Sequence, residues 1–194
     1  MTMRIKLLPL MIFFSFKTIG QNHKIIASTS LGLISNATRV EGLGATGFST
    51  TTSVEYKVSE KLWLTGTLDF QSISYLRTVG KLAIDGSLTT IPILIGGKYF
   101  LNTQSKFRPF IAGSMGISFA SIPNASSEAG KITLFSDSKF PFTYLLGVGL
   151  EWQAKPTFFP YIEVDYQSIS NNSAIFSNNP SYIPIRIGVR TYPF

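Results

Sequence analysis

Few side chains in this sequence have the chemistry of a catalyst. The chain has one histidine, His23, and no cysteine. Without a thiol we expect no disulfide, zinc–thiolate centre, catalytic cysteine or lipoprotein anchor. A histidine that acts as a general base must reach its nucleophile. His23 lies close to the start of the chain, so we interpret it as incidental and predict no catalytic residue, no cofactor and no metal site.

Glu163 and Asp165 are the second candidates, because two neighbouring carboxyl groups suit general acid–base chemistry. They lie two positions apart in an alternating segment, so their side chains share one face of a strand. Arg186 and Arg190 share one face of the final segment. Oppositely charged residues on neighbouring strands pair. We therefore interpret the two carboxylates as partners of these arginines and not as catalytic groups.

Most strand charges fall on this same face. They form a predicted lumen charge network of five acidic and five basic residues: Glu55, Lys57, Asp69, Lys98, Arg108, Glu151, Glu163, Asp165, Arg186 and Arg190. A buried charge without a partner is costly. Charges that are brought inside a protein in such balanced numbers are therefore expected to pair with one another.

Eight segments position these residues, and in each of them apolar and polar residues alternate with a period of two, which predicts β-strands. They cover residues 24–33, 48–58, 62–73, 88–101, 107–122, 142–153, 158–168 and the stretch from 182 onward. Short turns at 59–61, 102–106 and 154–157 alternate with long predicted loops, among them 74–86 and 123–140. This alternation, with strands long enough to cross a bilayer at a tilt, is typical of bacterial outer-membrane barrels.

The composition favours a barrel with its apolar face outward. Only 14% of the residues are charged, while 44% are hydrophobic, against about 25% charged residues in ordinary soluble domains. No apolar run of about 18 residues exists outside the N-terminus, so a helical span is not expected. We predict apolar side chains toward lipid and charges in the lumen, which in an eight-stranded barrel has just enough room for side chains.

Aromatic residues near the short turns predict an interfacial girdle, as outer-membrane barrels have. The residues concerned are Tyr56, Trp63, Tyr99, Phe100, Phe107, Trp152, Phe158, Phe159, Tyr192 and Phe194.

The final stretch is an amphipathic strand, with Ile185 and Ile187 on one face and Arg186 on the other. It resembles the closing strand of bacterial outer-membrane β-barrels. Phe194, however, shares the phase of Arg186. Either a bulge near Thr191 shifts the phase, or the strand ends there.

Two strand units, IPILIGGKYF at 91–100 and FRPFIAGSMG at 107–116, resemble the small outer-membrane β-barrel family common in Bacteroidetes; PYIE at 160–163 and IPIRIG at 183–188 repeat the pattern. The resemblance implies an all-β, eight-stranded antiparallel up-and-down transmembrane β-barrel, close in shape to the OmpA membrane domain and to OmpX and OmpW. It implies the outer membrane of a Gram-negative bacterium as the location.

The resemblance also implies the partners. They are outer-membrane lipid, lipopolysaccharide, and the barrel-assembly machinery through the C-terminal strand, with the chain as a monomer. Nucleic acid is not expected: without the basic residues of its leader the chain has 14 basic and 10 acidic residues, and no basic cluster stands out.

The first residues have the pattern of an export signal. Two positive charges precede an apolar segment at 7–16, and small residues follow. This pattern predicts a signal peptide over residues 1–20, cleaved between Gly20 and Gln21, and a barrel domain over 21–194.

Several functions remain open on the sequence. The first is a non-enzymatic barrel with a structural, adhesion or sensing role through its external loops. The alternatives are a narrow channel or an OmpW-like conduit for small apolar molecules, a soluble periplasmic ligand-binding barrel, and, last, an enzyme that modifies lipid A.

Overall fold

The computed structural model describes residues 24–37, 43–79, 82–128, 131–170 and 180–192. Nine strands make up its regular structure: β1 (Ile25–Asn36), β2 (Leu43–Lys57), β3 (Leu62–Val79), β4 (Leu82–Phe100), β5 (Phe107–Glu128), β6 (Lys131–Lys139), β7 (Phe142–Trp152), β8 (Phe158–Ile169) and β9 (Ser181–Thr191). The described residues contain no helix that is long and apolar enough to span a bilayer.

Eight of these strands close into a barrel. Each pairs antiparallel with its neighbours in the order β1, β2, β3, β4, β5, β7, β8 and β9, and β9 closes the ring on β1. β6 stands outside the ring and pairs with the far part of β5. The architecture confirms the predicted eight-stranded antiparallel barrel, with β6 as an addition.

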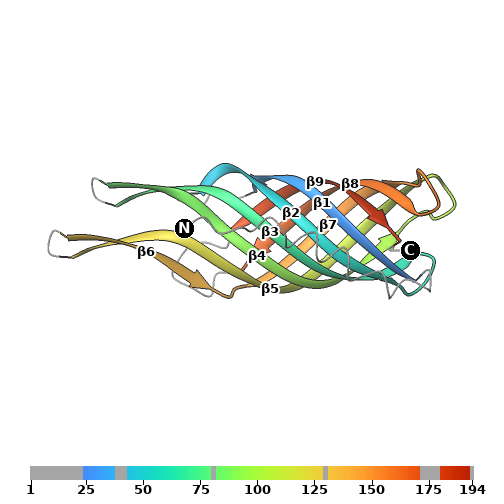
Figure 1. The fold of residues 1–194 in the computed structure, drawn as a ribbon, viewed down its shortest axis with the longest axis horizontal. Coiled ribbons are helices and arrows are strands. Elements are labelled where there is room, and N and C mark those ends of the chain that lie inside the picture. Colours follow the sequence, from blue (N-terminus) through green and yellow to red (C-terminus); the bar gives the residue numbers. More distant parts are fainter. Residues whose placement is uncertain (1–23, 38–42, 80–81, 129–130, 171–179, 193–194) are drawn as a thin grey trace, which may run out of the picture.

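Two strand pairs extend beyond the barrel at the same end (Figure 1). β3 and β4 stay paired as far as Val79 and Leu82, and β5 and β6 as far as Glu128 and Lys131. We call these pairs the β3–β4 ribbon and the β5–β6 ribbon. The predicted loops at 74–86 and 123–140 were therefore wrong: these residues are mostly strand, because the backbones of each ribbon satisfy one another's hydrogen bonds across the hairpin.

The barrel is apolar outside and polar inside. Burial alternates along β7 and β9 with a period of two. The outward side chains of Leu31, Ile95 and Ile187 are 68% to 74% exposed, whereas inward residues such as Glu55 and Gln71 are fully buried. A soluble barrel has the opposite distribution, because apolar surface avoids water.

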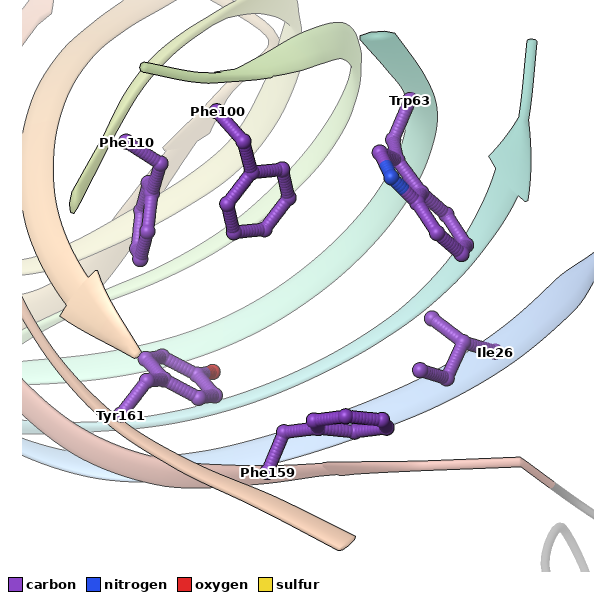
Figure 2. Close-up of a cluster of buried hydrophobic side chains, with 6 residues drawn as sticks. All are labelled: Ile26, Trp63, Phe100, Phe110, Phe159 and Tyr161. Carbon is purple, nitrogen blue, oxygen red and sulfur yellow. The ribbon is translucent and has the colours of Figure 1, made fainter. Parts of the chain in front are cut away.

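One apolar cluster lies toward each end of the lumen. The turn-end cluster lies beside the short turns, and its side chains point inward from the surrounding strands (Figure 2). It comprises Ile26, Trp63, Phe100, Phe110, Phe159 and Tyr161. The loop-end cluster lies toward the ribbons and comprises Ile34, Ile73, Leu88, Ile169 and Tyr182.

Candidate functional site

The structure places nine of the ten residues of the lumen charge network inside the barrel. Eight of them are at most 8% exposed, and Arg108 is partly buried. Lys57 corrects the expectation, because its Nζ lies 2.7 Å from Oε1 of Glu60 in the adjoining turn. Lys57 has the inward phase, but it is the last residue of β2. At the rim of the barrel, the turn and the surrounding water replace a partner in the lumen.

Arg190 is one of two arginines that organise the network. Its Nε donates to Oε2 of Glu55 at 2.9 Å, and its Nη1 donates to Glu151. Each carboxylate has a second cation, since Lys98 lies 3.3 Å from Glu55 and Arg108 pairs with Glu151. The five charges join strands from all around the barrel.

Arg186 is the other organising arginine, and it is the sole ion-pair partner of its two carboxylates among the described residues. Its Nη2 lies 3.0 Å from Oδ2 of Asp69, and its Nη1 lies 2.5 Å from Oδ2 of Asp165. Asp69 also accepts hydrogen bonds from Thr51 at 3.0 Å and from Gln71 at 2.7 Å. Burial without Arg186 would leave both aspartates uncompensated.

Both aspartates stand opposite a proline. The pairing of β3 with β4 skips two positions on each strand, and so does the pairing of β8 with β9. If the register is extended across the gaps, Asp69 faces Pro92 and Asp165 faces Pro184. Proline has no N–H to donate to the ladder. The pairing of the barrel wall is thus interrupted on both strands that carry the aspartates bound by Arg186.

Glu163 is the one carboxylate of the network without an ion pair within 4 Å among the described residues, and it is 8% exposed. It lies beside Asp165, near the inward face of Gly147. A Cβ on Gly147 would lie 3.2 Å from Oε1 of Glu163 and would overlap Oδ1 of Asp165. The glycine provides the room in which these two carboxyl groups sit.

Gly147→Ala is therefore expected to destabilise the folded barrel by about 1–3 kcal/mol, the usual cost of overpacking. The measurement is urea unfolding of the refolded protein in detergent. Gly66→Ala is the matched control, because no heavy atom lies within 4 Å of a Cβ there, and it should change stability by no more than about 0.5 kcal/mol. Equal stability of the two variants would contradict the close contact at Gly147.

A neutral polar layer separates the charges from the loop-end cluster. The amides of Gln71 and Gln167 bond to each other at 2.6 and 3.1 Å, and Thr90 donates to Gln71 at 2.9 Å. Ser118 and Thr143 bond at 2.6 Å. The sequence analysis did not single out these residues, although each shares the inward phase of its strand's charges.

The lumen is filled rather than open. Its central cavity has a volume of about 40 Å³ and is lined by hydroxyl groups and by charged residues, among them Glu55, Lys98, Glu163 and Arg186. A cavity needs about 10–15 Å³ to hold one water molecule, so this one has room for a few waters. Apolar clusters lie toward both ends of the lumen.

Aromatic rings cover the network on the turn side. The guanidinium carbon of Arg190 lies 4.8 Å from the ring centroid of Trp63 and 5.1 Å from that of Phe100. Lys98 lies 4.5 Å from the ring centroid of Phe110. Such cation–π contacts strengthen when water is excluded. The turn-end cluster therefore attracts these two cations as well as occupying its end of the lumen.

The predicted girdle is partly correct. Five aromatic residues are outward and 40% to 56% exposed, namely Tyr56, Tyr99, Phe107, Trp152 and Phe158. Trp63, Phe100 and Phe159 were wrongly assigned to it, because they have the inward phase and belong to the turn-end cluster.

The closing strand ends at Thr191 without a shift of register. The ring of Tyr192 packs edge-on against Phe159, with centroids 5.9 Å apart. Of the two expected arrangements, the strand therefore ends near Thr191 and has no bulge there, as far as Tyr192. Phe194 lies outside the described residues, as do His23 and the predicted cleavage site at Gly20 and Gln21.

The lumen charge network is suited to neutralising buried charges more than to catalysis. Eight of its charges form ion pairs with one another, and the described residues hold no group of three or more His, Cys, Asp or Glu side chains suited to a metal ion. Glu163 and Asp165 do lie together, but Asp165 is bound to Arg186, as the sequence analysis expected of opposite charges.

Comparison with known proteins supports the architecture. Neither family models nor curated protein sequences match this chain. Among solved structures, the chain is similar to Neisserial surface protein A (NspA), with a TM-score of 0.59 and 14% identity over 88% of this chain and 97% of that one. It is also similar to the Yersinia pestis attachment invasion locus protein Ail, solved with the heparin analogue sucrose octasulfate, with a TM-score of 0.53 and 17% identity over 86% and 99%.

A third similar structure is the outer membrane protein OprG of Pseudomonas aeruginosa, with a TM-score of 0.50 and 12% identity over 87% of this chain and 96% of that one. At such identities the likeness is one of fold. The apolar outer surface and the charged interior independently require a hydrocarbon surrounding. This chain is a transmembrane β-barrel with the fold of small outer-membrane proteins, and its place is the outer membrane of a Gram-negative bacterium.

Proposed function

We propose that this chain is a non-enzymatic outer-membrane barrel that binds an external partner through its two ribbons, in adhesion or sensing. The observation that carries the proposal is the contrast between a filled lumen and two strand pairs that continue past the barrel (Figure 1). In outer-membrane barrels the longer connections face outward from the cell. Among the described residues, the ribbons are then the part that reaches furthest into the surroundings.

The ribbons have open edges. Residues 82–88 of β4 pair with β3, and residues 122–128 of β5 pair with β6, whereas the pairing of β4 with β5 stops at Thr89 and Ser121. An open edge presents free N–H and C=O groups, which can pair with an extended segment of another protein. An extended protein segment is therefore the ligand that this surface suits best.

The names of similar proteins agree with such a role. NspA is called a surface protein, and Ail is named for attachment and invasion and was solved with a heparin analogue. The resemblance of the sequence to the small barrels of Bacteroidetes remains part of the proposal.

The direction of the backbone groups gives a specific test. Successive residues of a strand point their N–H groups to opposite sides. The N–H of Ser118 donates to the carbonyl of Pro141 at 2.9 Å. The backbone N–H groups of even-numbered residues of β5 therefore point toward β6, and those of odd-numbered residues point toward the open edge. Pro123 has an odd number, and a proline there removes no bond from the ribbon.

Ala125→Pro combined with Ser127→Pro should remove two N–H groups from the open edge and leave the ribbon paired. Cells that display this variant are expected to adhere about thirtyfold less to matrix proteins or epithelial cells, given about 1 kcal/mol for each of the two lost hydrogen bonds. Ser127→Ala, which keeps its N–H, is the control and should adhere like the unchanged protein. Heat-modifiable gel mobility checks that each barrel is folded.

Undiminished adhesion of the double proline variant would overturn the edge-binding proposal.

Planar-bilayer recording tests the second candidate function, a narrow channel or conduit. We expect no conductance steps from the refolded barrel, because paired charges and two apolar clusters occupy the lumen and leave a central cavity of only about 40 Å³. Regular single-channel steps would favour the channel.

A further inference from the structure

Three glycines of the barrel are not explained by packing. At seven of ten barrel glycines, a Cβ would come within 3 Å of a neighbouring atom. At Gly66 no atom lies within 4 Å, and at Gly97 and Gly113 the nearest atom is 3.4 Å away. Each of the three has an exposed apolar residue two positions before it and another two positions after it, so all three face lipid. Glycine weakens a strand interior, and it often marks a close approach by another molecule.

Two of these glycines form the floor of a groove. Gly97 and Gly113 are direct partners on β4 and β5. They line a groove of about 510 Å³ on the outer surface, bounded by Leu62, Tyr99 and Leu146. The groove is continuous with the lipid-facing surface of the barrel. An apolar chain that lies in it would contact the backbone directly at two neighbouring glycines.

The groove lies near the short turns. Leu62 is the first residue of β3, and Tyr99 is the last but one of β4. Because short turns face the periplasm in this architecture, the groove opens to the inner, phospholipid leaflet and not to the lipopolysaccharide leaflet.

Two exposed lysines lie at the turn end of the strands that line the groove, since Lys61 precedes β3 and Lys106 precedes β5. Lys61 directly precedes Leu62, and its carbonyl accepts a hydrogen bond from Phe100 at 2.8 Å. The carbonyl of Lys106 accepts one from Gln153, also at 2.8 Å. Both lysines are exposed. Basic residues at a membrane surface attract anionic lipid head groups.

We propose that this groove binds one anionic phospholipid of the periplasmic leaflet. One acyl chain lies over Gly97 and Gly113, and the phosphate lies between Lys61 and Lys106. The site requires only that the chain is a transmembrane barrel, so it stands or falls independently of ribbon-mediated adhesion.

The test is native mass spectrometry of the barrel released from vesicles of equal phosphatidylglycerol and phosphatidylcholine content. We expect one retained phospholipid per barrel, with phosphatidylglycerol preferred about thirtyfold, the effect of two lysines at a membrane surface. Lys61→Gln with Lys106→Gln should abolish the preference but keep binding. Lys24→Gln with Lys155→Gln removes the same charge from other exposed positions at this rim and should keep the preference.

Gly113→Leu should fill the groove and prevent retention of either lipid. Gly97→Val fills it from the neighbouring strand and should do the same. Gly66→Leu is the control, an outward glycine outside the groove, and should retain lipid normally. Heat-modifiable mobility confirms that each variant is folded.

Four results would overturn the proposal, and the first three concern the variants. They are normal retention in both folded groove variants, an equal loss in Gly66→Leu, and an equal loss of preference in both lysine pairs. A mass of two chains without lipid, abolished by Gly113→Leu, would also overturn it and make the occupant a second copy of the chain.

Discussion

Replacing Arg186 with methionine is expected to lower the free energy of unfolding of the barrel by about 3–5 kcal/mol, the cost of breaking a buried ion pair on one side. Arg186 is 4% exposed, and Asp69 and Asp165 have no other ion-pair partner among the described residues. Methionine keeps much of the side-chain length but removes the charge. Urea unfolding in detergent, followed by tryptophan fluorescence and by gel mobility, measures the loss.

A compensating variant isolates the electrostatic cause. Arg186→Met combined with Asp69→Asn and Asp165→Asn removes all three charges and keeps similar shapes. Replacing a complete buried charge group by neutral residues is often neutral or stabilising, so this variant should recover most of the lost stability. A single variant as stable as the unchanged barrel would mean that water, and not Arg186, compensates the two aspartates.

Replacing Ile95 with arginine is expected to destabilise the barrel by about 2–4 kcal/mol in a lipid bilayer, the cost of a cation near the bilayer midplane. Ile95 is 74% exposed and lies midway along the part of β4 that pairs with β5. On a water-facing surface the same change would alter stability by no more than about 0.5 kcal/mol. Reversible folding into phospholipid vesicles with urea gives the value.

Leu101→Arg is the matched control for depth. Leu101 is 53% exposed and follows the end of β4, beside the short turn. A cation near the interface costs about 0–1 kcal/mol. Similar small effects at both positions would contradict a membrane-facing outer surface.

The barrel could be read from the sequence because lipid and lumen impose opposite demands on successive residues. Along β7 and β9 the alternation runs nearly without interruption, and it gave the correct phase. Beyond the bilayer this constraint disappears, since both faces of a ribbon can meet water. The Ser- and Asn-rich residues of 123–140 therefore look like a loop, although backbone pairing makes most of them strand.

The sequence predicts which residues face the lumen, but it does not predict which of them form ion pairs with one another. Alternation places Asp69 and Arg186 inside, whereas their contact depends on the stagger of β3 against β9 around a closed ring. Height along the axis matters as much as phase. Lys57 has the inward phase but lies at the rim, and Trp63 lies near a turn yet points into the lumen.

The position of the arginines along the chain bears on assembly. Glu55, Asp69, Glu151 and Asp165 all precede Arg186 and Arg190 in the order of synthesis, and both arginines belong to β9, which meets β8 and β1 at the seam. Until β9 pairs with β1, the four carboxylates lack the arginines that β9 provides, and Asp69 and Asp165 lack any ion-pair partner among the described residues. Closing the barrel and completing its ion pairs are thus a single late step. In an assembly intermediate that lacks the β9–β1 pairing, these carboxylates remain hydrated.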